Sequence, residues 1–93
     1  MAVYVDDFRV PWRGREWSHL TADTTEELHE FAARLGIPKR GFHNNPARPW
    51  KDHYDIPEAL RGTALRLGAK PINRREAVAR LRAKRAESRA VGG

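Results

Sequence analysis

The chain has 93 residues, which is enough for one hydrophobic core and too short for two domains of ordinary size. Its 40% hydrophobic and 32% charged residues are typical of a folded domain, and the absence of cysteine excludes disulfide frameworks, thiolate metal sites and thiol redox chemistry. The formal net charge of +6 favours anionic partners.

We therefore expect one domain over residues 1–93, with its core in about 1–82 and a frayed, solvent-exposed tail over about 83–93. No run of apolar residues approaches the length of a membrane span. Two acids also interrupt the N-terminal segment where a signal peptide is apolar. We expect a cytoplasmic protein with no membrane partner, and the sequence leaves its oligomeric state open.

The N-terminal segment predicts strands. Residues 3–5 are β-branched and aromatic and are followed by Asp6 and Asp7, which are poor strand formers. Residues 8–10 either prolong this strand or form a neighbour before Pro11 interrupts. The first strand is therefore predicted to end at a pair of carboxylates.

A second strand is predicted over residues 17–21, where large and small side chains alternate. Trp17 and His19 share one face of it. Residues 37–38 and 69–72 are further candidate strand entries, and their prolines indicate edge positions.

Three helices are predicted, because a short polar residue is followed three positions later by Glu in each case, as in a capping box. The pairs are Asp23 with Glu26, Asp55 with Glu58, and Asn73 with Glu76. The first helix ends at Gly36 and the second at Gly68, while the third loses its apolar face beyond Ala83. Residues 40–51 between the first two helices form a long loop with Phe42 and Trp50 as anchors.

These elements predict an α/β fold of two or three layers: a small mixed sheet of three or four strands with two packed helices and a basic C-terminal helix. Polar side chains fall at strand segments and at a helix start, which converge in such folds. We expect one polar pocket, and its residues are Asp6, His19, His53, Tyr54 and Asp55, with Asp7 beside it. Carboxylate plus imidazole suits either a divalent cation or general acid-base chemistry.

Each carboxylate also has a structural interpretation. Asp23 and Asp55 are explained by N-capping alone, and Asp6 and Asp7 are explained by protection of an edge strand. These interpretations stay open beside the functional ones.

The histidines divide in the same way. His19 and His53 are site candidates, although a histidine near an aromatic residue is often a hydrogen-bonded structural group. His29 lies among glutamates and is interpreted as solvated, and His43 has no partner at a recognisable spacing. No established metal-binding, phosphate-loop or nucleophile-elbow motif is present.

The predicted third helix carries an excess of basic residues that can attract a phosphate backbone, or serve only as a solvated face. Those that we expect to contact an anion are Arg74, Arg75, Arg82 and Arg85. Aromatic residues interleaved with basic ones are suited to stacking on bases, or else fill the core. They are Trp12, Trp17, Phe42 and Trp50.

Several fragments in order along residues 1–76 resemble the domain of unknown function 4031 family of small bacterial and phage proteins. They are M-x-V-Y-V-D-D, S-H-L-x-A-D-T-x-E-E-L-H, R-L-G, H-Y-D-I and L-G-A before Pro71. The resemblance implies that residues 3–6, His19, Asp23 and residues 53–55 form a shared site, and it implies no activity. Members commonly have an aromatic residue followed by Gln where Gly41-Phe42-His43 stands here, and a shorter path into H-Y-D.

The function expected from these features is a small accessory protein that binds a phosphate-bearing ligand, a nucleotide or nucleic acid through the His/Asp pocket and the basic helix. The candidate catalytic residues are Asp6, His19, His53 and Asp55, and the candidate ligand-binding residues are Tyr4, Asp7, Asp23, Tyr54, Arg74, Arg75, Arg82 and Arg85. One alternative is a phosphoesterase or nuclease in which Asp6 and Asp55 hold a divalent cation and a histidine moves a proton. Another is a protein-interaction module anchored by Trp12 and Trp50.

Overall fold

A computed structural model describes residues 2–44 and 46–92. Met1, Asn45 and Gly93, the last of which ends the expected tail, lie outside the described residues. The strands are β1 (Val3–Val5), β2 (Val10–Trp12), β3 (Arg15–Ala22), β4 (Phe42–His43), β5 (His53–Pro57) and β6 (Lys70–Pro71). The helices are α1 (Thr25–Arg34), α2 (Glu58–Arg66) and α3 (Arg74–Gly92), with short 3-10 turns η1 (Lys39–Gly41) and η2 (Pro49–Lys51).

The strands of the described residues form one mixed sheet of six, in the order β4-β5-β3-β1-β6, with β2 also paired to β3. The pairing of β1 with β6 is parallel and the others are antiparallel. The mixed α/β class is confirmed, but the expected three or four strands are too few. The strands that sequence patterns do not predict are β2, β4 and β5. Strands β2 and β4 have only two or three residues each, too short to show an alternating pattern, and β5 includes residues that the capping pattern assigns to a helix start.

Strands β1 and β2 pair with the same strand, β3, and are separated by residues 6–9. Arg9 has a positive φ of 49° in this interruption. The turn between β2 and β3 also has positive φ at both central residues, Arg13 and Gly14, as type I′ hairpin turns require. Residues 8–10 thus neither prolong β1 nor form a strand as a unit, because the paired segment resumes at Val10.

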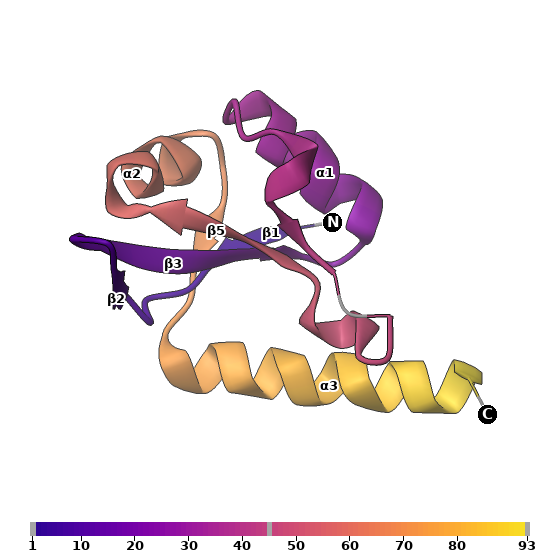
Figure 1. The fold of residues 1–93 in the computed structure, drawn as a ribbon. Coiled ribbons are helices and arrows are strands. Elements are labelled where there is room, and N and C mark those ends of the chain that lie inside the picture. The colour runs from indigo at the N-terminus through magenta and orange to yellow at the C-terminus, as the bar shows by residue number, and fades with distance from the viewer. Residues whose placement is uncertain (1, 45, 93) are drawn as a thin grey trace.

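One face of the sheet carries the core. Side chains alternate along β3, so that Leu20 and Ala22 are buried on one face while His19 lies on the other. Tyr54 and Ile56 of β5 add to the buried face, which packs against α1 and α2. Figure 1 shows both helices on the same side of the sheet.

Helix α3 lies on the opposite side, so the protein has three layers (Figure 1). Its first turns face the sheet through Ala77, which is buried, and Leu81, which is half-buried. Further along it packs against η2 and then extends past the sheet. The expectation of two packed helices is therefore one too few. The predicted fraying of the last turns stays a prediction.

The predicted helix starts are correct in one case of three. Asn73 and Glu76 form the reciprocal capping box of α3. Helix α1 starts one residue later than expected, because the Thr24 hydroxyl, and not Asp23, accepts the hydrogen bond from the Glu27 amide. Asp55 caps nothing: it lies within β5, and α2 begins after Pro57 without a side-chain cap.

The segment between α1 and β5 also differs from the long loop expected. It contains η1, β4 and η2, because Phe42 pairs opposite Tyr54 and His43 opposite His53. Residues 37–38 enter no strand. The other expected strand entry, at 69–72, is β6 at the edge of the sheet.

Candidate metal centre beneath α3

Four polar side chains gather on the face of the sheet that α3 overlies. His19 of β3 lies directly opposite Asp55 of β5, and His53 of β5 lies opposite His43 of β4. Residues two apart on a strand project to the same face, so this register places three imidazoles around one carboxylate. The expected convergence of His19, His53 and Asp55 is found, and His43 joins them.

The distances make Asp55 the centre of the cluster. Its Oδ2 lies 3.1 Å from Nε2 of His43, and its Oδ1 lies 3.3 Å from Nε2 of His53 and 3.8 Å from Nε2 of His19. Asp55 is half-buried, and His43 is the most exposed of the three histidines. The cluster can therefore exchange ions and protons with solvent.

Asp6 is the buried support of this cluster. Its side chain is 5% exposed, and its Oδ2 lies 2.7 Å from Nδ1 of His19. Its Oδ1 accepts hydrogen bonds from the backbone amides of Phe8 (3.2 Å) and His19 (3.0 Å). With both oxygens occupied, Asp6 orients the His19 ring so that Nε2 faces Asp55, which differs from the metal-holding role expected for it.

His53 is oriented in a similar way by the backbone. Its Nδ1 lies 2.6 Å from the carbonyl oxygen of Lys51, so Nδ1 donates a proton there and Nε2 is the nitrogen that faces Asp55. The His19 and His53 rings meet edge to face, and the rings of His43 and His53 stack in parallel at 4.9 Å. Both inner histidines thus present Nε2 toward Asp55.

Hydrogen bonds and charges within the cluster shift the pKa values of His53 and Asp55. Burial of the His53 ring acts to lower its pKa, but hydrogen bonds with Asp55 and the Lys51 carbonyl and the charges of Asp55 and Asp6 outweigh it, so the pKa is raised. The hydrogen bond with His53 lowers the pKa of Asp55 against the opposing effect of burial, and the neighbouring imidazoles add to this. The carboxylate is thus held in its charged form.

The donor set fits a divalent transition metal. One ligand atom from each of His19, His53 and Asp55 lies within 4.8 Å of the other two. Imidazole nitrogen with carboxylate oxygen suits Zn²⁺ or Mn²⁺ better than Ca²⁺ or Mg²⁺, which prefer oxygen ligands alone. Histidines that bind a metal usually donate the other ring N–H to a carboxylate or a carbonyl, and Asp6 and Lys51 supply one of each.

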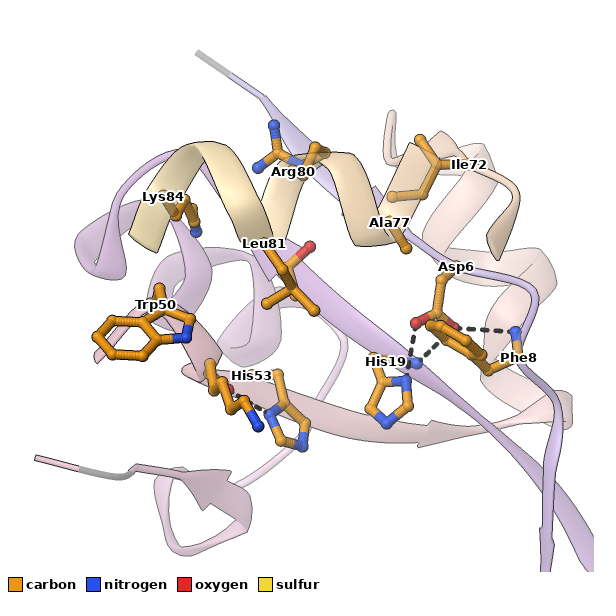
Figure 2. Close-up of a pocket in the computed structure, with 12 residues that line it drawn as sticks. Asp6, Phe8, His19, Trp50, His53, Ile72, Ala77, Arg80, Leu81 and Lys84 are labelled. Carbon is orange, nitrogen blue, oxygen red and sulfur yellow. Dashed lines mark hydrogen bonds and ion pairs between the residues drawn. The ribbon is translucent and has the colours of Figure 1, made fainter. Parts of the chain in front are cut away.

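A cavity of about 280 Å³ adjoins the cluster between the sheet and α3. His19 and His53 form part of its floor, and Leu81 projects from α3 into its roof (Figure 2). Lys84 and Arg80 of α3 line the same cavity. The hollow therefore joins imidazoles, apolar surface and cationic groups.

Tyr54 does not belong to this pocket, which corrects the expectation. Strand alternation turns it to the other face of the sheet, where it is 1% exposed in the core. Burial raises the pKa of its phenol, and its hydroxyl lies 2.7 Å from Nδ1 of His29. His29 is therefore a half-buried partner of Tyr54 and not the solvated residue predicted.

Tyr4 and Asp23 lie in a separate group at the end of β1 and β3. Asp23 bonds to the Ala2 amide (3.0 Å), to Tyr4 and to Arg80 (3.3 Å), and the Arg80 guanidinium stacks 3.5 Å above the Tyr4 ring. Lys84 donates a hydrogen bond to the Ala22 carbonyl beside them. This group fastens α3 to the sheet, next to the cavity.

The remaining predicted residues lie at the surface. Asp7 is exposed and lies outside the cluster, since Asp6 is the carboxylate that turns inward from the interruption. Arg74 stacks over Phe8 at 4.9 Å, and Arg85 over Trp50 at 5.5 Å. The two arginines that remain are both exposed; they are Arg75 and Arg82.

Sequence reasoning misses His43 and Lys84. His43 is found only if residues 42–43 are recognised as a strand whose aromatic-His order mirrors His53-Tyr54 across a hairpin. Lys84 is found only if α3 is placed against the sheet, since residues 77, 81 and 84 then share its inner face.

The fold and this cluster define a small mixed α/β protein with a His/carboxylate centre under its C-terminal helix. The sequence profile of the family described as "Protein of unknown function (DUF4031)" matches residues 3–84, and the chain belongs to that family. The match reaches into α3, further than the resemblance over residues 1–76. Comparisons with curated proteins and with solved structures find no similar protein.

The helices of residues 2–44 and 46–92 include none with the length and apolar character needed to cross a bilayer.

Proposed function

We propose that this protein is a divalent-metal-dependent phosphoesterase, with His19, His53 and Asp55 as metal ligands. The observation that carries the proposal is the meeting of three ligand atoms within 4.8 Å, with Nδ1 of both histidines already engaged by Asp6 and the Lys51 carbonyl. Such preorganisation is what a metal centre needs and what a chance cluster of surface histidines lacks.

The residues around the centre have separable roles. A Zn²⁺ or Mn²⁺ ion held there would supply Lewis-acid polarisation of a phosphoryl oxygen. Lys51, which lines the adjoining cavity next to His53, attracts the phosphate and offsets its negative charge. His43, the most exposed histidine, lies 3.1 Å from Asp55 and is the group that carries a proton between the site and solvent.

The test is calorimetric titration of the metal-free protein with Zn²⁺, Mn²⁺ and Mg²⁺, followed by hydrolysis of bis(p-nitrophenyl) phosphate and p-nitrophenyl phosphate. We expect one Zn²⁺ or Mn²⁺ ion per chain and metal-dependent hydrolysis. Asp55→Asn and His53→Gln remove a ligand and should abolish both, whereas His29→Gln, on the core side of the sheet, should bind metal normally. Absence of binding by all three metals would overturn the proposal.

A second candidate function is binding of single-stranded nucleic acid along α3. It is favoured by the position of Arg74 and Arg85, which stack on Phe8 and Trp50, because both aromatic residues line the cavity. Cations next to aromatic rings can grip a phosphate backbone and stack on bases. The protein-interaction alternative has less support, since Trp12 is exposed but Trp50 lines a cavity.

Binding to a fluorescent single-stranded oligonucleotide at several salt concentrations tests this candidate. The affinity should fall as salt rises, because each arginine that neutralises a phosphate releases a counterion. Arg74→Gln with Arg85→Gln should reduce the slope of log affinity against log salt by about 0.7 for each arginine replaced. Lys39→Gln, in η1 on the α1 side of the sheet, is the matched charge control. No binding at low salt would exclude this function.

A further inference from the structure

The cavity beneath α3 has apolar walls that a phosphate alone does not need. Phe8 and Trp50 contribute aromatic rings, and Ile72, Ala77 and Leu81 contribute aliphatic surface. Its volume of about 280 Å³ lies just below the roughly 300–1,000 Å³ of pockets for drug-sized ligands. The space therefore suits one ring system and not a long chain.

Polar groups stand at both ends of this apolar hollow. At one end are His19, His53 and Lys51, next to the candidate metal centre. At the other are Arg80 and Lys84 of α3. A ligand that spans the cavity must therefore present an anion at the first end and hydrogen-bond acceptors at the second.

The second end of the cavity has hydrogen-bond donors that are available to a ligand. Within the described part of the chain, Nη2 of Arg80 is buried and has no hydrogen-bond partner, while Nη1 is paired with Asp23. Burial, reinforced by the charge of Arg80, lowers the pKa of Lys84, which donates to the Ala22 carbonyl. A hydrogen-bond acceptor, such as a nucleobase carbonyl or ring nitrogen, matches these donors.

We propose that the cavity binds the nucleoside part of a mononucleotide, with the base under α3 toward Arg80 and Lys84 and the phosphate at the His/Asp cluster. This inference rests on the proposed phosphoesterase function, whose substrate class it names. Because α3 forms the roof of the cavity, a base within a duplex does not reach it (Figure 2). The substrate is a nucleoside monophosphate or an unpaired terminal nucleotide.

Calorimetric titration of the Zn²⁺-loaded protein with uridine and adenosine 5′-monophosphates, inorganic phosphate and uridine tests the inference. A nucleotide should bind at least about tenfold more tightly than inorganic phosphate, as burial and stacking of one base predict. Leu81→Trp fills the cavity and should remove this advantage without changing Zn²⁺ affinity. Val78→Trp, on the exposed side of the same helix, is its matched control.

A second variant, Lys84→Gln with Lys39→Gln as its control, tests the inference even if Leu81→Trp does not fold. Lys84→Gln should weaken the binding of nucleotides but not the binding of inorganic phosphate. If both nucleotides bind no more tightly than inorganic phosphate, or if the Leu81 and Lys84 variants bind them like their controls, the inference is overturned. Titration of the metal-free protein with Zn²⁺, Mn²⁺ and Mg²⁺ separates the two proposals. Normal metal binding without nucleotide preference overturns this inference alone, and absence of binding by all three metals overturns the proposed function.

Discussion

The buried carboxylate of Asp6 hydrogen-bonds both to the nearby backbone and to the His19 side chain of the candidate site. Its Oδ1 accepts two amide hydrogen bonds where β1 pauses, and its Oδ2 holds the His19 ring. A buried charge is tolerated only when it is well hydrogen-bonded, and these contacts meet that need. The position of the ring therefore depends on the same group that shapes the chain beside it.

Replacement of Asp6 by Asn should weaken metal binding by about 10- to 100-fold, the usual effect when a metal-binding histidine loses the group that orients it. The single amide oxygen of Asn cannot serve both the two backbone amides and the His19 ring. Calorimetric titration with Zn²⁺ measures the change, and Asp7→Asn, at the exposed neighbouring position, should bind normally. Equal affinity of both variants would contradict the orienting role of Asp6.

Asp23 makes stability depend on pH on the acid side. Partial burial acts to raise its pKa, but hydrogen bonds from Tyr4 and Ala2 and the charge of Arg80 outweigh it, so the pKa is lowered. A lowered carboxyl pKa stabilises the folded state above the ordinary value near 3.8, and this contribution is lost as the pH falls through the folded value.

The stability difference between the wild type and Asp23→Asn should therefore be constant above about pH 5 and shrink below about pH 4. Urea unfolding followed by circular dichroism at about pH 3 to 7 measures it. Glu30→Gln, an exposed acid on α1, should show no such convergence. A difference that grows as the pH falls would show that the sign is wrong.

At the scale of residues, sequence reasoning finds those site members that stand next to strand patterns. His19 lies in a predicted alternating strand and Asp6 follows another, whereas His53 is found only as a polar residue at an assumed helix start, although it lies in β5. Tyr54 is placed wrongly when a helix start is assumed at Asp55, because strand alternation then plays no part in separating it from His53. A polar residue three positions before Glu is a weak signal when it falls inside a strand.

At the scale of elements, replacement of glycine by alanine should change the stability of the protein in opposite directions at Gly14 and Gly62. Gly14 has a φ of +73° in the hairpin turn, and Gly62 lies inside α2, where an added Cβ would make only an ordinary contact with Arg66. Alanine at Gly14 should destabilise the protein by about 1 kcal/mol, because a side chain disfavours positive φ. Alanine at Gly62 should stabilise it by about 0.5–1 kcal/mol.

Thermal and urea unfolding of the two variants measure these changes. Neither glycine lies in the site, so Zn²⁺ affinity should be unchanged in both. If Gly14→Ala proves as stable as the wild type, then the turn does not need the left-handed conformation seen in the structure.

Helix boundaries show what sequence patterns can settle at this scale. The Asn73 and Glu76 box is correct because no competing residue lies beside it. At α1 both Asp23 and Thr24 are suitable caps by residue type, and tertiary bonds to Arg80 and Ala2 withdraw Asp23 from the helix. Local propensity yields to tertiary contacts at such positions.

At the scale of the whole molecule, the sheet separates the main hydrophobic core from the candidate site. The core between the sheet and α1 and α2 holds most of the buried apolar side chains, whereas the α3 side holds the cluster and the cavity. The composition and the periodic helices predict the α/β class, but the side on which α3 packs is a long-range property. No local pattern in residues 74–92 reveals it.

Hydrogen exchange should reflect this division. Amides of β3 and β5 should exchange slowest, because they pair at the centre of the sheet. In α3, amides of the last turns should exchange faster than those near Ala77, since the helix extends past the sheet at its C-terminal end, as the predicted frayed tail requires. Mass spectrometry of peptic fragments measures both, and uniform protection along α3 would contradict the prediction.

The interruption of strand pairing between β1 and β2 determines how the deletion of one or two residues there would affect the sheet. Val5 pairs with Leu20, yet Val10 and not Phe8 lies opposite Trp17, so the chain takes in two residues beyond a continuous pairing. Because two is an even number, side chains before and after the interruption keep the same alternation between the two faces of the sheet. Removal of one residue from positions 7–9 would turn the side chains of the β2–β3 hairpin to the opposite face relative to β1. Removal of two would join β1 and β2 into one continuous strand and would remove the bend that contains Asp6.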